Sequence, residues 1–308
     1  MKVLGISCGR RNGNGELLLK RALKTVEENG HEVEYLRLQD FYIAPCTGCE
    51  LCSGPESHKD GVFTPKCVHK WDEDDFQFII EKVLESDGLI ISAPAYQLTV
   101  PGILFTFFNR IHCYGFARHT KEADAQKRVF ASIGVGGSDM LNLFSPFINF
   151  IGTELCGSQM DRLIDQMLVY YCAPIKGITL RPEAFARAER LGQNIAEALK
   201  ELPGRTTYRG DKNEVCPVCH NDIVQIQDGR VRCPVCNFYG RAEIVDGLLK
   251  VTFDGGEDAS RFKDNAAEEK MHKQQRSPYE AVKEHKDEVD RVFKEWTSYL
   301  QPLKKPAK

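Results

Sequence analysis

The sequence predicts an α/β fold: a doubly wound, five-stranded parallel sheet, joined to a small four-cysteine domain and a C-terminal helix. Strand-like apolar runs alternate five times with helical patterns over about the first 200 of 308 residues, which is the order of a doubly wound sheet. The run at 88–93 (GLIISA) is continuously apolar, as strands covered on both faces are. Two identical Cys-Pro-Val-Cys segments further along predict the small domain.

The individual elements follow from apolar periodicity and from residues that start or stop a helix. A stretch ending at Asn29-Gly30 has apolar residues on one helical face, and such a pair stops a helix. Asp74-Asp75 precedes a second helical pattern and suits its N-terminus. The predicted strands cover 2–8, 31–38, 88–93, 127–135 and 167–172; the predicted helices cover 16–28, 74–84, 102–110, a stretch after 139, and 182–202.

Composition shifts divide the chain into four parts. We predict an α/β domain over 1–203 that carries a cysteine-containing loop at 39–72, a linker over 204–214, a four-cysteine domain over 215–252 and a charged helical tail over 253–308. Ser277-Pro278 suits a helix start, and an apolar stripe follows. That stripe either docks onto its own domain or forms a subunit contact. Its members are Val282, Val289, Phe293, Trp296 and Leu300.

Three loops that follow predicted strands, at 8–15, 94–102 and 134–139, are rich in Gly, Pro, Ser or Asn. Ligands of such sheets bind beyond the carboxyl ends of the strands. A strand, a glycine-rich loop and a helix in sequence place N–H groups against a phosphate, although an ordinary βα turn is the alternative. The dinucleotide fingerprint and the P-loop Lys-Ser/Thr are absent, which favours a single phosphate. Flavin mononucleotide (FMN) would fit all three loops.

Several ordered segments carry a family resemblance: GISCGRRNGNGELLLKRAL, IAPCTGCELC, KCVHKWDEDDFQFIIEKVLESDGLIISAPAYQLTVPG and SIGVGGSD. They resemble the NADPH-dependent FMN reductase branch of the flavodoxin-like superfamily, and within it the iron–sulfur flavoproteins, over about residues 1–200. The resemblance implies a flavodoxin-like fold with bound FMN. It implies phosphate contacts from Ser7, Arg10, Asn12, Gly13 and Asn14, ring contacts from Pro94, Ala95, Tyr96 and Gln97, and contacts to the pyrimidine edge from Gly136 and Gly137.

One position departs from the family pattern. Phosphate loops of this family usually carry Thr or Ser after the last Asn, whereas this chain has Gly15. One hydroxyl donor is therefore missing, and we expect backbone amides with Asn12 or Asn14 to compensate.

The first cysteine cluster has the spacing that wraps a [4Fe–4S] cluster with three thiolates, at Cys46, Cys49 and Cys52. Cys67 is the nearest fourth ligand, although fourteen residues intervene and iron–sulfur flavoproteins have a more compact motif. His58 and His69 are possible substitutes. Free thiols, as in many FMN reductases of this branch, and another metal are the alternatives. Of the remaining four cysteines, Cys8 lies in the phosphate loop and is expected to be a weak donor there. The other three are expected to be small buried hydrophobes: Cys113, Cys156 and Cys172.

The second cluster predicts a zinc ribbon, with four thiolates at Cys216, Cys219, Cys233 and Cys236. A hairpin with an Asp228-Gly229 turn bridges the two Cys-x-x-Cys knuckles. The segment cannot build its own core, so a metal must supply its folding energy. A rubredoxin-type mononuclear iron site is the alternative. Rubredoxins usually place Gly after the second cysteine of a knuckle, whereas His220 and Asn237 stand here, which favours zinc.

Bulk composition excludes several functional classes. The net charge of −3 and the pI of about 6.3 give no reason to expect nucleic-acid or membrane attraction. No run of about 18 apolar residues is present to span a bilayer. Twelve cysteines without an export signal argue against a disulfide framework. We therefore expect metal-ligating cysteines in a reducing cytoplasm.

The function predicted from these features is an FMN-dependent oxidoreductase that resembles iron–sulfur flavoproteins. It would move electrons between NAD(P)H or ferredoxin, FMN and an acceptor that the sequence does not name. A plain NAD(P)H-dependent FMN reductase without a cluster, a non-catalytic electron-transfer flavoprotein and a redox-sensing scaffold are the alternatives. No catalytic side chain is predicted, because the flavin carries the chemistry. The resemblance also implies a homo-oligomer, in which loop 39–72 is long enough to cover a neighbouring subunit's flavin.

Overall fold

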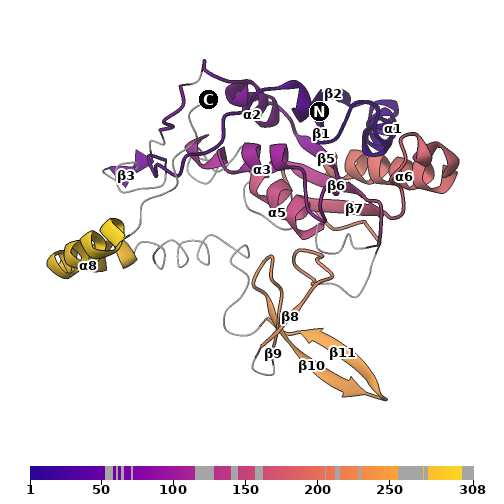
Figure 1. Cartoon of the computed structure of the whole chain (residues 1–308). Coiled ribbons are helices and arrows are strands. Elements are labelled where there is room, and N and C mark those ends of the chain that lie inside the picture. Colours follow the sequence, from indigo (N-terminus) through magenta and orange to yellow (C-terminus); the bar gives the residue numbers. More distant parts are fainter. Residues whose placement is uncertain are drawn as a thin grey trace. The chain divides into compact units, whose positions relative to one another are not determined.

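The computed structural model describes residues 1–52, 58–59, 62–63, 66–70, 72–114, 128–139, 145–156, 162–204, 206–211, 216–227, 230–255, 273 and 277–299. The chain forms two compact units, Met1–Ser260 and Arg261–Lys308. The parallel sheet and the cysteine ribbon both belong to the first unit (Figure 1).

The main sheet confirms the predicted five-stranded, parallel, flavodoxin-like architecture. Its order is β2-β1-β5-β6-β7, and every neighbouring pair is parallel. The chain passes from β1 to β2 at one edge of the sheet and then returns past β1 to β5 on the other side. Such folds bind ligands at this reversal of strand order. The strands are β1 (Lys2–Ser7), β2 (Glu32–Arg37), β5 (Gly88–Pro94), β6 (Val129–Val135) and β7 (Leu163–Val169).

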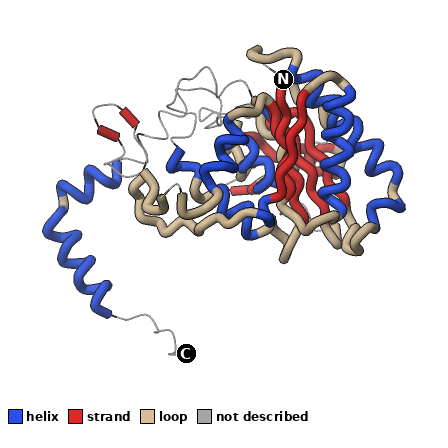
Figure 2. The backbone as a smooth tube through the Cα atoms, turned by 90° about the horizontal axis from the view of Figure 1, so that it is seen from above, coloured by secondary structure: helices blue, strands red, loops and turns tan. Residues whose placement is uncertain are grey.

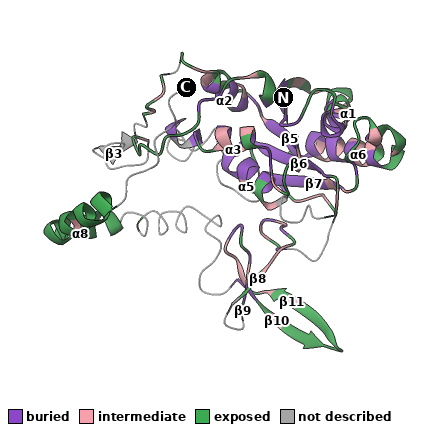
Figure 3. Cartoon of the chain, viewed as in Figure 1, coloured by how far each residue is buried: buried purple, intermediate pink, exposed green. Residues whose placement is uncertain are grey.

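Helices cover both faces of the sheet (Figure 2). One face carries α1 (Asn14–Glu28) and α6 (Pro182–Leu199), and the other carries α2 (Phe76–Leu84), α3 (Gly102–Phe108) and α5 (Ser145–Leu155). Two apolar clusters result, one on each side of the strands, so β1, β5 and β6 are almost entirely buried, whereas the edge strand β2 is only partly buried (Figure 3). Three short 3₁₀ turns complete this region: η1 (Leu38–Asp40), η3 (Ile111–Tyr114) and η6 (Gly177–Leu180).

The fifth strand differs from its predicted bounds, since it spans 163–169 rather than 167–172. Its first half contains Asp165, which is fully buried and interrupts the apolar pattern. Arg187 of α6 binds both carboxylate oxygens of Asp165, at 2.9 and 2.5 Å, and Asn194 donates to it at 2.8 Å. The buried pair satisfies the charge, so the strand begins four residues early and leaves 170–176 as a loop.

Within the predicted cysteine loop, β3 (His58–Lys59) pairs with β4 (Val62–Phe63) in an antiparallel two-stranded sheet. No strand was expected there, because two-residue strands leave no periodic signal.

The ribbon contains a four-stranded antiparallel sheet in the order β11-β10-β9-β8. Its strands are β8 (Gln225–Gln227), β9 (Arg230–Arg232), β10 (Tyr239–Val245) and β11 (Leu248–Phe253). The predicted hairpin between the two knuckles is present as β8 and β9, although its turn at Asp228-Gly229 lies outside the described residues, and β10 with β11 forms a second hairpin. Ile244, Leu248 and Leu249, at the far end of the β10–β11 hairpin, are mostly exposed.

The second unit contains α8 (Lys286–Tyr299), preceded by helical residues 277–284. Helix α8 has no buried residue, and its largest apolar side chains, Phe293 and Trp296, are 67% and 63% exposed. Leu300 of the predicted stripe lies outside the described residues. In the described part of the chain, no helix is both long and apolar enough to cross a membrane.

Candidate flavin and metal sites

A cavity of about 320 Å³ lies at the carboxyl ends of the parallel strands. Ser7 ends β1, Pro94 ends β5 and Val135 ends β6, so the loops after three adjacent strands meet there. The cavity is therefore at the reversal of strand order. Its lining residues are Ser7, Gly9, Arg10, Gly13, Asn14, Gly15, Glu16, Ser92, Pro94, Ala95, Tyr96, Val135, Gly136, Gly137, Cys172 and Ala173.

Nine of the eleven residues predicted to contact FMN line this cavity, and Asn12 and Gln97 do not. Asn12 has a left-handed backbone (φ 56°), and its N–H donates to Glu16 Oε2 at 3.0 Å, so it shapes the turn before α1. Gln97 and Leu98 both have positive φ in a tight turn, which the hydrogen bond from Tyr96 N–H to Thr99 O closes at 2.9 Å. Asn12 and Gln97 therefore each form part of a turn next to the cavity.

Asn14 has a different position from that expected of a phosphate ligand. Its side chain is buried, and its amide donates to the carbonyls of Cys172 and Pro174, each at 2.8 Å. Its oxygen accepts from Ile178 N–H at 3.4 Å. Asn14 therefore ties the loop after β7 to the start of α1, and the backbone N–H groups of the first helical turn remain for a ligand.

The structure accounts for the glycine at position 15. A Cβ atom there would lie 2.7 Å from Ser92 Oγ and 3.5 Å from Val135 Cγ2. The Ser92 hydroxyl instead donates to Gly15 O at 2.9 Å, and Ser92 also lines the cavity. A hydroxyl from β5 thus stands beside the position where the family usually has one on α1.

The two glycines after β6 have different roles. Gly136 N–H donates to Val169 O at 3.0 Å, and Gly136 O accepts from Cys172 N–H at 2.8 Å. Gly136 therefore joins the loops after β6 and β7. A Cβ atom at Gly137 would lie 3.2 Å from Ala173 Cβ, so its small size keeps these loops close.

The phosphate end of the cavity contains both signs of charge. Arg10 is exposed and donates to Ala173 O at 3.1 Å. Burial opposes ionisation of Glu16, but hydrogen bonds from Lys20 and the Asn12 N–H outweigh burial and lower the pKa of this carboxyl. Lys20 Nζ lies 2.7 Å from Glu16 Oε1, so the negative charge of Glu16 is compensated. Arg10 and the N-terminus of α1 then remain to attract an anion.

Besides Gly15, six lining residues were not predicted to contact FMN, and two of them follow from the misplaced fifth strand. Cys172 and Ala173 were assigned to the end of that strand or beyond it, whereas they lie in the loop after β7. Ser92 could have been identified from the sequence, because a polar residue near the end of an otherwise apolar strand is a candidate for a ligand site. The others are Gly9, Glu16 and Val135.

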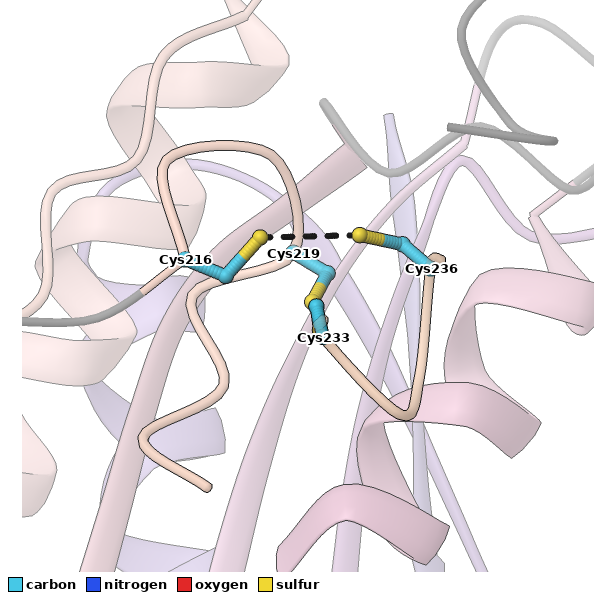
Figure 4. A group of neighbouring side chains, drawn as sticks. All are labelled: Cys216, Cys219, Cys233 and Cys236. Atoms are coloured by element: carbon cyan, nitrogen blue, oxygen red, sulfur yellow. Dashed lines mark hydrogen bonds between the residues drawn. The ribbon is translucent and has the colours of Figure 1, made fainter. Parts of the chain in front are cut away.

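The four ribbon cysteines converge (Figure 4). All four are fully buried, and their sulfur atoms lie within 4.8 Å of one another. The Cys216–Cys236 and Cys219–Cys233 sulfur separations are 3.5 and 3.3 Å. A tetrahedral ion with bonds of about 2.3 Å needs sulfur separations of roughly 3.8 Å, so the set fits a single ion.

The two knuckles have the same backbone geometry. His220 N–H donates to Cys216 O at 2.8 Å, and Asn237 N–H donates to Cys233 O at 3.0 Å. Both residues have positive φ, 55° and 64°, the conformation that glycine adopts most easily. His220 and Asn237 therefore adopt the left-handed conformation at the positions where rubredoxins usually have glycine.

The ribbon is fastened to the main sheet beside one knuckle. Gln166 of β7 donates to His220 O at 2.7 Å. The His220 ring stacks on Tyr208, with centroids 3.9 Å apart and planes 13° apart. Burial lowers the pKa of His220 to about 4, so this imidazole is neutral near pH 7 and stacks as an uncharged ring.

The N-terminal cysteines are arranged more openly. Cys46 and Cys49 are exposed, while Cys52 and Cys67 are half-buried and packed against the core. Among the described residues, the ribbon set is the one group of three or more candidate ligands within 4.8 Å. That finding does not count against a [4Fe–4S] cluster, in which each thiolate binds a different iron and the sulfurs stand farther apart.

The environment of these thiols is uneven. Burial, with the charge of Cys46 and then Cys49, raises the pKa of Cys52. A hydrogen bond from the Leu51 backbone lowers the pKa of the exposed Cys49. Of the two alternative histidine ligands, His69 is hydrogen-bonded to Pro45 O at 3.0 Å, and the side chain of His58 lies outside the described residues.

Comparisons with known proteins agree with this architecture. The family model for NADPH-dependent FMN reductases matches residues 1–143. Flavone synthase cfoJ of Aspergillus candidus is 26% identical over 274 residues, 80% of this chain and 79% of that protein. An iron–sulfur flavoprotein of Archaeoglobus fulgidus is 29% identical over 206 residues, 65% of this chain and 81% of that protein.

The NAD(P)H-dependent FMN-containing oxidoreductase YwqN of Bacillus subtilis is 30% identical over 167 residues, 51% of this chain and 82% of that protein. A solved flavone reductase has a TM-score of 0.75 and 24% identity, covering 99% of this chain and 100% of that one, which shows a common fold. The chain therefore belongs to the NADPH-dependent FMN reductase family, as an FMN-dependent oxidoreductase related to the iron–sulfur flavoproteins.

Proposed function

We propose that the cavity at the strand ends holds FMN, with its phosphate at the start of α1 and its ring along 94–96. The observation that carries this proposal is the convergence of nine predicted contact residues on one cavity. Arg10 and the first N–H groups of α1 would face the phosphate, while the Ser92 hydroxyl is bonded to Gly15 O and supports the turn. Gly137 would supply the amide at the pyrimidine edge, because the Gly136 N–H is bonded to Val169.

Asn14 provides a direct test of this site. Asn14→Ala removes three hydrogen bonds that join α1 to the loop after β7. At about 1 kcal/mol each, the three bonds amount to about 3 kcal/mol, so their loss should weaken FMN binding by up to about 150-fold. Fluorescence titration of the apoprotein with FMN measures it. Asn29→Ala, at the other end of α1, is the matched control and should bind normally. Equal affinity in both variants would contradict the proposed site.

We further propose a zinc ion on Cys216, Cys219, Cys233 and Cys236, and a [4Fe–4S] cluster on Cys46, Cys49, Cys52 and Cys67. The burial and convergence of the ribbon sulfurs support the first assignment. The cysteine spacing and the similarity to iron–sulfur flavoproteins support the second. The domain division predicted above, with a metal-dependent ribbon at 215–252, is part of this proposal.

In this arrangement the protein positions redox groups rather than transferring protons. When bound, FMN supplies hydride acceptance from NAD(P)H, the donor used by the family, and a cubane supplies single-electron transfer. Tyr96, which is 43% exposed, would bound one side of the ring and leave room for a nicotinamide or an acceptor. The donor in this proposal is NAD(P)H rather than ferredoxin.

The decisive experiment is anaerobic purification with metal, acid-labile sulfide and flavin analysis. We expect about one zinc, about four irons with about four sulfides, and about one FMN per chain. Zinc and FMN without sulfide would leave a plain NAD(P)H-dependent FMN reductase. A second iron population without sulfide would indicate a rubredoxin-type ribbon.

A second candidate concerns the electron acceptor. The match to the flavone synthase extends over 274 residues, beyond the sheet domain. We therefore propose flavone-type aryl enones as candidate substrates, in either redox direction. Anaerobic NADPH oxidation with and without a flavone, followed by product mass analysis, tests this. A two-hydrogen mass gain in the flavone is expected for reduction, and an unchanged flavone with unchanged NADPH consumption would reject it.

We also propose that the protein is a homo-oligomer whose contacts include α8. The exposed stripe on that helix supports this, since a 14-residue helix is marginal in water without packing. Light scattering should show a smaller assembly for Phe293→Glu/Trp296→Glu, while Ser298→Glu, a matched charge change on the same helix, should behave as the unmodified protein. An unchanged mass in the double variant would contradict the proposal.

A further inference from the structure

We infer that Arg110 is a positioning residue for the N-terminal cysteine site: it holds Cys67 beside the Cys46–Cys52 motif and supplies a buried positive charge to the thiolates. This inference rests on the proposed iron–sulfur function of those cysteines. It concerns a residue with no motif of its own, in the segment that follows α3.

The guanidinium of Arg110 is deeply buried and is fixed from several sides. The residue is only 2% exposed, and its Nη1 atom donates to a carboxylate oxygen of Asp74, itself fully buried, and to Ala44 O at 3.3 Å. The guanidinium carbon lies 4.4 Å from the centre of the Phe76 ring. Few conformations are open to such a side chain, so its remaining donors point in set directions.

One of those remaining donors, Nη2, faces a cysteine of the site. Arg110 Nη2 lies 3.8 Å from Cys67 Sγ, and the Arg110 carbonyl accepts from Cys113 Sγ at 2.8 Å. The Nε atom is buried and has no hydrogen-bond partner among the described residues. A buried unpaired guanidinium donor costs free energy, and that cost falls when sulfur anions are present nearby, because hydrogen bonds from a cation to an anion are strong.

Arg110 also explains how Cys67 reaches the motif in spite of the intervening residues. Asp74 accepts from Ala44 N–H at 2.8 Å and from Phe76 N–H at 3.2 Å. The Arg110–Asp74 pair therefore joins Ala44, shortly before the first cysteine of the loop, to Phe76 at the start of α2, just beyond the loop. Nη2 then holds Cys67 against the same pair, so the long loop is closed around the cysteines by one buried ion pair.

The charge balance points the same way. Asp74 compensates Arg110 when the thiols are neutral. A cluster ligated by four thiolates carries net negative charge, and a fixed cation beside it stabilises the added electron on reduction. Removing this cation should lower the reduction potential, while loosening Cys67 should lower the iron content.

The test compares three anaerobically purified full-length variants with the unmodified protein. Arg110→Met removes the charge and all donors, and Arg110→Lys keeps the charge but not the planar fork. Arg128→Met is the matched control, because Arg128 is equally buried and donates to Val83 O and Leu84 O at the end of α2. Since Arg110→Met leaves Asp74 as a lone buried charge, Asp74→Asn/Arg110→Met is added to keep the fold.

The readouts are iron and sulfide per chain, and the potential of the cluster in a spectroscopic titration. We expect both Arg110→Met variants to lose at least half of the iron and sulfide, with normal zinc and FMN. Any cluster that remains in Arg110→Met should be harder to reduce, and less so in the double variant, which removes one charge of each sign. Arg110→Lys should retain the potential better than the iron content, and Arg128→Met should change neither.

The possible failures are distinguishable. An unmodified protein without sulfide would reject the proposed iron–sulfur function itself. Full iron content and an unchanged potential in Asp74→Asn/Arg110→Met, in a protein whose unmodified form holds the cluster, would overturn the role of Arg110 alone. Equal iron loss in Arg128→Met would also overturn it, because the effect would then belong to any buried arginine.

Discussion

The two cysteine clusters have similar spacing in the sequence but different structures. In the ribbon, all four thiols are buried and their sulfurs lie within 4.8 Å. In the N-terminal loop, two thiols are exposed, two are half-buried, and the fourth comes from beyond a 14-residue insertion. Cysteine spacing therefore identifies a candidate metal site. Burial of the thiols and hydrogen bonds of the surrounding backbone determine how far that site is preorganised before a metal binds.

The difference is one of supporting structure. Each ribbon knuckle closes on itself through a backbone hydrogen bond across the pair of cysteines, and the ribbon has little apolar core of its own. The N-terminal loop instead depends on the Arg110–Asp74 pair and on the main core, against which Cys52 and Cys67 pack. Losing the metal should therefore unfold the ribbon but leave the sheet domain folded.

The largest expected effect follows from breaking the ribbon site. Cys219→Ser should remove zinc and unfold residues 216–255, because structural zinc supplies about 10–16 kcal/mol to such small sites. FMN content should stay within about 20% of normal, since no lining residue of the cavity belongs to the ribbon. Zinc analysis and limited proteolysis measure the two effects. Cys156→Ala, another buried thiol, should retain zinc; a zinc-loaded Cys219→Ser would contradict the assignment.

The corresponding change in the N-terminal loop should have a large effect on iron and a small one on stability. Cys49→Ser should eliminate iron and sulfide, yet alter unfolding by less than about 0.5 kcal/mol when the apoproteins are compared, because Cys49 is exposed. Zinc and FMN should remain. Iron analysis and urea unfolding check this. A folding defect as severe as that of Cys219→Ser would remove the distinction between the two clusters.

How much of this was predictable varies with the range of the interactions. Strand–helix alternation and the ribbon spacing are local patterns, and the sheet they predict is the one observed. Four strands lie within about two residues of their predicted bounds. The predicted bounds of the fifth strand were wrong because the buried charge of Asp165 is balanced by Arg187. Arg187 lies 22 residues away in the sequence, too far for a local hydrophobic pattern to include it.

The site shows the same limit. The resemblance predicted eleven FMN contacts, and nine of them line one cavity, but it did not predict that the amide of Asn14 bonds to the loop after β7. The contact of Ser92 with Gly15 and that of Arg110 with Cys67 join segments 77 and 43 residues apart. Such pairs follow from the fold, and neither residue of a pair carries a local motif that identifies the other.

The smallest expected effect concerns the turns of the two knuckles. The non-glycine residues at these turns are the reason why the sequence predicts zinc rather than iron. Asn237 has φ 64°, a conformation that glycine and asparagine adopt at low cost and alanine does not. Asn237→Gly should change the stability of the zinc-loaded ribbon by less than about 0.5 kcal/mol, while Asn237→Ala should cost about 1 kcal/mol. Competition with a chromogenic zinc chelator ranks the variants. Since both substitutions remove the contact of Asn237 with Arg232, their difference isolates the backbone, and equal zinc retention would show that the left-handed turn does not limit this site.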